Sequence, residues 1–146
     1  MKSNKKKIIW LSLTLLIIAA VALGLYMYNK GPINVKKARA IQIEAALLYT
    51  AFEKDTMAAN KKFAGKIVQV KGIVKEVSLN QQNEQVILLH TSSGDASINT
   101  TMEEANGSVK TGNAINLKGI CSGIGEADTD LGLKADVYLT RAYIIE

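Results

Sequence analysis

Three carboxylates stand at alternating positions in one short segment, and their spacing is the closest that this sequence comes to metal chemistry. The segment reads Glu126-Ala-Asp128-Thr-Asp130-Leu-Gly132. Hard cations such as Ca²⁺ prefer clustered carboxylate oxygens. The twelve-residue calcium loop is incomplete, because neither a third Asp or Asn at the next ligand position nor a closing Glu follows. We therefore predict a solvated acidic loop, in which Glu126, Asp128 and Asp130 are the first place to look for a ligand.

The sequence supplies little for nucleophilic or acid–base catalysis. It contains one Cys, Cys121, and one His, His90. A single Cys excludes an internal disulfide framework and a Cys-built zinc site, and leaves almost no material for a Cys–His catalytic pair. The adjacent Glu103 and Glu104 splay apart on a helix, so they do not form an acid–base pair. We expect a protein that is not an enzyme, with no catalytic residue, cofactor or metal.

His90 and Cys121 each fit an ordinary structural role better than a chemical one. A lone His on a strand is more often a surface or packing residue than a ligand. A free Cys beside an apolar neighbour commonly behaves as a small buried hydrophobic residue. For Cys121 the alternative is an intermolecular disulfide outside the cytoplasm.

The elements that must position these residues begin with a segment of membrane length, residues 8–28. It carries no charge, and as a helix it covers roughly 30 Å, the hydrocarbon thickness of a bilayer. Trp10 stands near one end and Tyr26 and Tyr28 near the other, where interfacial aromatic residues are found. The segment predicts a transmembrane signal-anchor helix. The alternative is a signal peptide cleaved near Ala20-Val-Ala22.

A basic cluster before this segment predicts its orientation. The N-terminus, residues 1–7, holds Lys2, Lys5, Lys6 and Lys7. The cytoplasmic flank of a span carries an excess of Lys and Arg. Basic residues also follow the span, but a long domain can translocate in spite of them. We expect a single-pass protein of the cell membrane whose C-terminal domain lies outside the cytoplasm.

The net charge of +5 suggests a nucleic-acid or anionic-membrane partner, but its distribution changes that interpretation. From Ile41 onward the chain has 10 Lys and Arg against 13 Asp and Glu, a net charge of −3. The positive excess lies in the flanks of the apolar segment, where it favours anionic headgroups. With 48% hydrophobic residues in 146, the chain is not disordered and has room for one ordinary domain.

Residues 29–37 predict a linker, and residues 38–64 predict a helical lead-in to the domain. A juxtamembrane helix is expected from Val35 to Lys54, since its apolar residues recur on one helical face. These residues are Ile41, Ala45, Leu48 and Phe52. A second short helix is expected from Met57 to Phe63, capped by Asp55-Thr56.

From Lys66 the apolar residues alternate, which predicts strands within a domain of residues 65–146. A Gly inside the first strand, Gly72, predicts a bulge or sharp bend. A helical turn is expected at residues 102–106. The five expected strands are residues 66–77, 85–91, 96–100, 113–121 and 135–145. This order, with a small helix between the third and fourth strands, is typical of a five-stranded OB-fold barrel in a mainly β protein with helices.

Several short motifs carry a resemblance to a known family. They are Phe52-Glu-Lys-Asp55, Lys62-Phe63-Ala-Gly-Lys66, Val70-Lys-Gly-Ile-Val74, Leu117-Lys-Gly-Ile-Cys-Ser-Gly123, Asp130-Leu-Gly132 and Val137-Tyr-Leu139. On these residues the chain resembles the tRNA-anti-like OB-fold family, whose members are mostly small bacterial envelope proteins. The motifs are mainly small and apolar, so the resemblance implies a fold more than a function. The family pattern often has a second Cys near the position of Ala142, so its pairing with Cys121 is absent here.

OB-folds usually bind ligands on the face of their second and third strands and in the adjoining loops. Residues 85–100 contain no aromatic residue, Lys or Arg, whereas binding of single-stranded nucleic acid needs exposed aromatics beside a basic groove. The aromatic residues beyond the span are Tyr49, Phe52, Phe63, Tyr138 and Tyr143, and most of them are expected in the core. We predict a non-catalytic binding module with a protein or envelope partner. The alternative is a nucleic-acid-binding OB-fold protein at the membrane.

Overall fold

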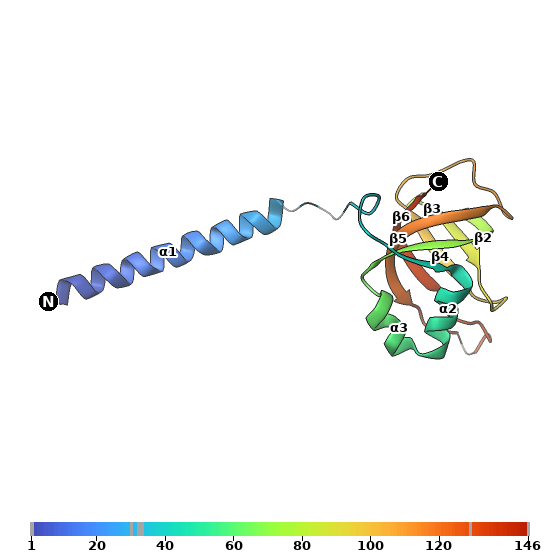
Figure 1. Ribbon diagram of the computed structural model, residues 1–146, viewed down its shortest axis with the longest axis horizontal. Coiled ribbons are helices and arrows are strands. Elements are labelled where there is room, and N and C mark those ends of the chain that lie inside the picture. The colour runs from blue at the N-terminus through green and yellow to red at the C-terminus, as the bar shows by residue number, and fades with distance from the viewer. Residues whose placement is uncertain (1, 30, 32–33, 129, 146) are drawn as a thin grey trace. The chain divides into compact units, whose positions relative to one another are not determined.

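The N-terminal helix and the C-terminal domain are two separate units of the computed structural model, Met1–Ile33 and Asn34–Glu146 (Figure 1). The structure describes residues 2–29, 31, 34–128 and 130–145, with side chains from residue 7 onward. The first unit contains α1, Lys2–Asn29. Its part Lys7–Asn29 is long and apolar enough to cross a membrane. A signal sequence near the N-terminus has the same length and composition.

The second unit is a closed barrel of five strands, which confirms the predicted OB-fold barrel. Its strands are β2 (Ile67–Leu79), β3 (Gln85–His90), β4 (Ser97–Met102), β5 (Ala114–Ile124) and β6 (Val137–Ile144). The strand order is β2-β3-β4-β6-β5, and the pairing of β2 with β5 closes the barrel. The pair of β4 and β6 is parallel and the other pairs of the barrel are antiparallel.

The long strand β2 closes the barrel because it changes partners along its length. Residues 67–73 pair with β5, and residues 74–79 pair with β3. The β-bulge lies between Val74 and Glu76, so the bulge expected at Gly72 is found a few residues later. A Cβ on Gly72 would lie 2.9 Å from the Cβ of Ala45, so this Gly permits close packing.

The predicted helix from Val35 to Lys54 is wrong in its first part. Residues Ile41–Glu44 form a strand, β1, which pairs in parallel with β2, and the helix α2 occupies Ala45–Lys54. Hydrogen bonding to the edge of β2 outweighs the helical spacing, and the β-branched Ile41 and Ile43 suit a strand. The rest of the predicted apolar face is buried in α2: Ala45, Leu48 and Phe52.

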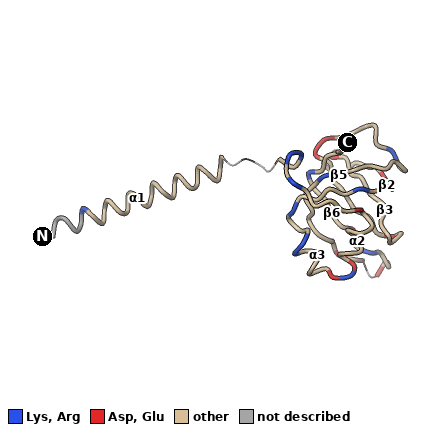
Figure 2. The backbone as a smooth tube through the Cα atoms, viewed as in Figure 1, with Lys and Arg blue, Asp and Glu red and all other residues tan. Residues whose placement is uncertain are grey.

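The first residues of the second unit pack against the barrel. The sequence had predicted that the linker extends to residue 37. Val35 is 1% exposed. The ammonium of Lys118 donates a hydrogen bond to the carbonyl oxygen of Lys36 at 2.9 Å, and the Lys36 side chain pairs with Glu104. The domain therefore begins at Asn34. Figure 2 shows that basic residues are frequent along this first stretch and beside α3.

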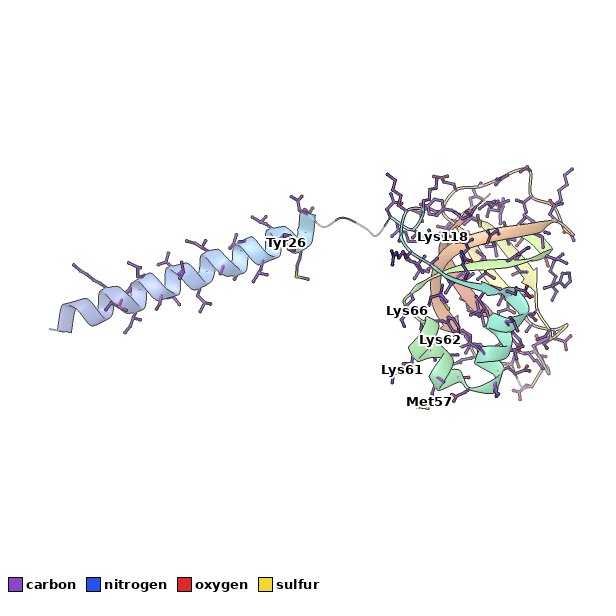
Figure 3. The ribbon with its side chains drawn as sticks, viewed as in Figure 1. Tyr26, Met57, Lys61, Lys62, Lys66 and Lys118 are labelled. Carbon is purple, nitrogen blue, oxygen red and sulfur yellow. The ribbon has the colours of Figure 1, made fainter. Side chains whose placement is uncertain are left out.

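The short helix α3 is Thr56–Phe63, so it starts one residue before the predicted Met57. Of the predicted cap Asp55-Thr56, Asp55 is the N-cap residue. The Asp55 carboxylate accepts a hydrogen bond from the backbone N–H of Ala58 at 2.9 Å. Phe63 is buried, and its ring centroid lies 6.2 Å from that of Phe52 on α2. Figure 3 shows the exposed Met57 and the lysines of α3 projecting from the domain.

The helical turn expected at residues 102–106 is absent from the described structure, since Met102 ends β4 and bends follow. Other segments use the backbone groups of this stretch. The N–H of Glu103 bonds to the carbonyl of Ala142, and the Gln85 side chain bonds both the N–H and the carbonyl of Asn106. The helices that contact the barrel, α2 and α3, precede it in the chain.

The core fills the barrel from all five strands and from both short helices. Inward positions alternate along each strand, as β geometry requires. The largest side chains with at most 1% exposure are Phe52, Phe63, Leu48, Ile87, Leu89, Ile98, Leu117 and Leu139. The valines of β2 complete it, including Val68, Val70 and Val74, which alternate along the strand and are fully buried.

Replacing Gly72 by Ala should destabilise the domain. The added Cβ meets the Cβ of Ala45 at 2.9 Å and the Cδ1 of Leu89 at 3.2 Å, so the junction of β1 and α2 must shift. We expect the free energy of unfolding to fall by about 1–3 kcal/mol, measured by urea denaturation of the full chain in detergent. Gly107→Ala is the matched control, because nothing lies within 4 Å of its Cβ position. Equal stability of the two variants would contradict the packing argument.

Candidate functional site

On the side of β2, β3, β4 and β6 that faces away from the core, polar and apolar side chains lie next to one another. One row across it consists of the register partners Glu76, Leu88, Asn99 and Tyr138. A second row consists of Ser78, Val86 and Thr101. Their chain neighbours Ile87, Ile98 and Val137 are fully buried, so alternation places these rows outside the barrel. We call these seven residues the outer face.

Tyr138 is the exposed aromatic side chain of the outer face, at 41% exposure. Its ring lies against Gly125, where an added Cβ would come within 2.7 Å of the ring atom Cε2. A Gly at this position therefore leaves room for the ring beside the strand. Tyr49, Phe52 and Phe63 are in the core as expected, but the core was the wrong expectation for Tyr138. The alternation around it, Val137-Tyr138-Leu139, was the signal that could have identified it.

The two cations on this part of the barrel are already bonded. The Lys75 ammonium, at the bulge of β2, donates to the carbonyl oxygen of Gly94 at 3.1 Å and to the Ser97 hydroxyl oxygen at 3.2 Å. The Nε of Arg141 on β6 donates to a carboxylate oxygen of Glu103 at 3.2 Å. The outer face therefore presents little free positive charge, and Glu76 adds a negative one.

The carboxylates that the sequence singled out lie in the loop between β5 and β6, and all three are exposed. The carboxylate of Asp128 accepts hydrogen bonds from the backbone N–H groups of Asp130 and Leu131, at 3.2 and 3.1 Å. Asp128 therefore organises its own turn. Across the described residues, no group of three His, Cys, Asp or Glu side chains could hold a metal ion. A ligand at Glu126, Asp128 and Asp130 stays a prediction.

His90 is exposed at the end of β3 and lines a shallow, mainly apolar groove of about 440 Å³. The groove lies where β1 meets α2, and its lining includes Glu44, Ala46, Lys71 and Ile73. His90 is thus a surface residue, which is one of the two structural roles that the sequence predicted.

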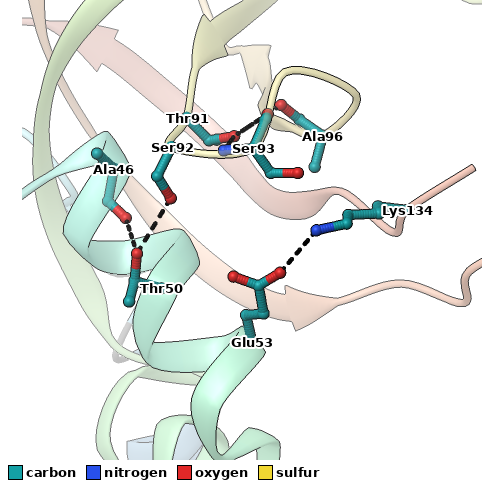
Figure 4. A network of polar contacts seen from close by, with 8 residues as sticks. All are labelled: Ala46, Thr50, Glu53, Thr91, Ser92, Ser93, Ala96 and Lys134. Carbon is teal, nitrogen blue, oxygen red and sulfur yellow. Dashed lines mark hydrogen bonds and ion pairs between the residues drawn. The ribbon is translucent and has the colours of Figure 1, made fainter.

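A polar network joins α2 to the loops that border the outer face (Figure 4). The hydroxyl groups of Thr50 and Ser92 lie 3.1 Å apart, and Thr50 donates to the carbonyl oxygen of Ala46. The Lys134 ammonium lies 2.8 Å from a carboxylate oxygen of Glu53, and this bond raises the pKa of Lys134. The network fixes the loops after β3 and β5 to one helix.

Tyr49 lies next to this network and is 2% exposed. Burial raises the pKa of its hydroxyl group, the nearby Glu53 carboxylate raises it further, and a hydrogen bond with Ser93 opposes the rise. The group is therefore neutral at physiological pH and serves packing. It gives no acid or base to the outer face.

Cys121 is fully buried on β5, opposite Leu139, as the sequence predicted for a small hydrophobic residue. Burial raises the pKa of its thiol, and a backbone hydrogen bond from Gly123 opposes the rise. Ala142, where the family resemblance implied a second Cys, packs against Gly119. This geometry leaves Cys121 without solvent access for an intermolecular disulfide.

The thiol of Cys121 should be almost unreactive in the folded chain. We expect its reaction with a neutral disulfide reagent near pH 8 to be roughly 100-fold slower than in urea, because a raised pKa and burial both withhold the thiolate. Stopped-flow absorbance gives both rates. A Ser108→Cys variant supplies an exposed thiol as the control. Equal rates for the two thiols in the native state would contradict the burial of Cys121.

The match to one protein family agrees with this fold. A family model described as tRNA_anti-like matches residues 1–131. Among solved structures, a protein described as an aspartyl-tRNA synthetase from Leishmania major Friedlin has 9% identity and a TM-score of 0.44 over 78% of this chain and 22% of that one. The aspartyl-tRNA synthetase from Entamoeba histolytica has 11% identity and a TM-score of 0.39 over 58% and 19%. The chain thus spans about a fifth of either protein. No curated protein sequence matches it.

Proposed function

The chain belongs to the tRNA_anti-like family, and from this premise we propose that it is a membrane-anchored OB-fold module without catalytic activity. Its domain lies outside the cytoplasm and binds an uncharged, extended polymer of the cell envelope, a glycan strand in the first instance. The apolar helix α1 holds the module in the cell membrane. The ligand lies across the outer face.

The observation that carries this proposal is the row of Leu88, Asn99 and Tyr138 on the outer face. A sugar ring places its apolar side on an aromatic ring and its hydroxyl groups on amide and hydroxyl partners. Tyr138 supplies the exposed ring, and Asn99 and Thr101 supply the polar partners on the neighbouring strand. OB-folds bind oligosaccharides as well as oligonucleotides in this region of the barrel.

Charge favours the glycan over a nucleic acid. Binding of single strands depends on cations that neutralise phosphates and on several stacking aromatics. On the outer face the ring of Tyr138 stands alone among the described residues, and the nearby Lys75 and Arg141 are bonded within the protein. Nucleic-acid binding at the membrane is therefore the second candidate, supported by the fold alone.

Placement outside the cytoplasm follows from charge on the N-terminal side of α1. Four lysines at positions 2, 5, 6 and 7 precede the apolar residues. The cytoplasmic flank of a span usually carries such a cluster, and the four cations that follow α1, at positions 30, 36, 37 and 39, do not prevent a long domain from translocating. The alternative is cleavage within α1, near Ala20-Val-Ala22, and the membrane experiment below distinguishes these cases.

Binding should depend on Tyr138 and should change little with salt. We expect the full chain to bind an N-acetylglucosamine hexamer in calorimetry, with about tenfold weaker affinity for Tyr138→Ala and near-normal affinity for Tyr138→Phe. The ring, not the hydroxyl group, supplies the stacking surface. The affinity should stay constant between about 50 and 200 mM salt, because no phosphate is neutralised.

The same titration with a short oligothymidine tests the second candidate. Tight binding that weakens steeply over this range of salt would replace the glycan with a nucleic acid. Failure of both probes to bind, or an unchanged affinity in Tyr138→Ala, would refute the role of the outer face.

The domain should be removed by protease added outside the cell. Spheroplasts that express the full chain with a C-terminal tag should lose the tag on protease treatment, while a cytoplasmic protein stays intact. Immunoblotting of the membrane fraction before treatment shows whether α1 is retained. Full protection of the tag, with digestion of an outward-facing control protein, would reverse the orientation.

A further inference from the structure

The strongest concentration of positive charge on the domain lies where α3 and β2 meet the first residues of the unit. Five exposed cations surround this position, and we call them the basic face: Lys37, Arg39, Lys61, Lys62 and Lys66. Figure 3 shows Lys61 and Lys62 of α3, and Lys66 just before β2, along one side of the domain. Residues from Ile41 onward have a net charge of −3 although they include three of these lysines, so the rest of the domain is acidic.

Contacts within the domain bring these cations together. The ammonium of Lys66 donates to the carbonyl oxygen of Lys61 at 3.2 Å, which joins the end of α3 to the start of β2. Arg39 and Lys66 each precede by two residues the register pair Ile41–Val68, so the parallel pairing of β1 and β2 brings them close. The basic face is therefore one surface built from three segments.

The charges of the basic face are available to a partner. In the part of the chain that the structure describes, the ion pairs use Lys36, Lys134 and Arg141, and none uses a residue of the basic face. The Lys62 ammonium lies 5.1 Å from the ring centroid of Phe63 and remains exposed. Five cations without a carboxylate partner repel one another, so they favour an anionic surface.

An exposed apolar side chain accompanies these cations. Met57 is 85% exposed. It lies one helical turn before Lys61, so both side chains are on the same exposed side of α3. The opposite side of this helix is buried through Ala59 and Phe63. An apolar residue among lysines on a helix is typical of segments that lie in the headgroup layer of a bilayer.

We propose that the basic face docks on an anionic bilayer surface, with Met57 entering the headgroup layer. The inference rests on the proposed anchoring by α1. Only six residue steps separate Asn29, the end of α1, from the buried Val35, and they span at most roughly 20 Å. An anchored domain therefore keeps its first residues close to the bilayer, and Lys37 and Arg39 follow these residues directly.

Each cation near an anionic leaflet is expected to raise the ratio of docked to undocked domain about fivefold. Tethering makes this attraction intramolecular, so a few cations suffice. The anionic headgroups of the membrane thus orient the anchored domain.

The test measures the accessibility of α3 in the full chain incorporated into lipid nanodiscs. The probe is the thiol of an Ala58→Cys variant, beside Met57, and its reaction with an uncharged maleimide is followed by mass spectrometry. In discs of phosphatidylcholine and phosphatidylglycerol we expect the reaction to be at least fivefold slower than in phosphatidylcholine alone. Salt at roughly 1 M should abolish the difference. Ser108→Cys, in the β4–β5 loop, should react equally in both discs.

Matched neutralisations identify the basic face as the cause. Lys61→Gln with Lys62→Gln should lower the docked-to-undocked ratio about 30-fold and restore fast reaction. Lys71→Gln with Lys110→Gln makes the same change of charge on exposed lysines outside the basic face, and should leave the slow reaction intact. Both pairs stay on the surface, so unfolding is not expected, and the unreactive Cys121 reports it if it occurs.

Equal reaction rates in the two kinds of disc, for a chain that co-elutes with the discs, would overturn docking and leave the anchor and the glycan site intact. A chain that does not co-elute would overturn the anchor, and the docking with it. Protection of the Ala58→Cys thiol by oligothymidine in phosphatidylcholine discs, without protection by phosphatidylglycerol, would assign the basic face to nucleic acid and overturn the bilayer proposal.

Discussion

The whole domain depends on one strand that must serve two partners. β2 pairs first with β5 and then with β3, and its bulge between Val74 and Glu76 allows the change. Without this change of pairing partner the sheet would stay open, and its inner apolar side would face water. The first half of β2 also receives β1 along its free edge, so the lead-in residues are bound to the same strand. Gly72 allows this junction to pack closely, because a side chain there would collide with Ala45.

Closure of the barrel separates packing from recognition. Alternation on curved strands sends Ile87, Ile98 and Val137 inward, and leaves Leu88, Asn99 and Tyr138 in a row outside. The row is a consequence of parallel pairing between β4 and β6, which brings residues far apart in sequence side by side. The loops beside it are held by the network around α2. This rigid support is what a binding site for an extended polymer needs.

Charged residues are also distributed unevenly over the surface of the domain. The domain from Ile41 onward is acidic as a whole, yet its cations concentrate where α3 and β2 meet the first residues of the unit. Two surfaces of different character result: a basic face, and an outer face whose neighbouring cations, Lys75 and Arg141, are bonded within the protein. In the proposals above the first meets the membrane and the second meets the ligand. The acidic loop of Glu126, Asp128 and Asp130 belongs to neither surface, and Asp128 uses its carboxylate to build its own turn.

The sequence by itself determined the apolar helix, the five strands of the barrel, the capped α3 and the burial of Cys121, because these depend on local periodicity, capping and composition. Tertiary structure decided the rest. Residues 41–44 form a strand because the edge of β2 offers hydrogen bonds. No helical turn forms at residues 103–106, because Gln85 and Ala142 hydrogen-bond to the backbone of this stretch. The alternation Val137-Tyr138-Leu139 already directs Tyr138 outward, but its position beside Asn99 depends on the register of β4 and β6. Pairing between distant segments sets these features, and no local pattern encodes it.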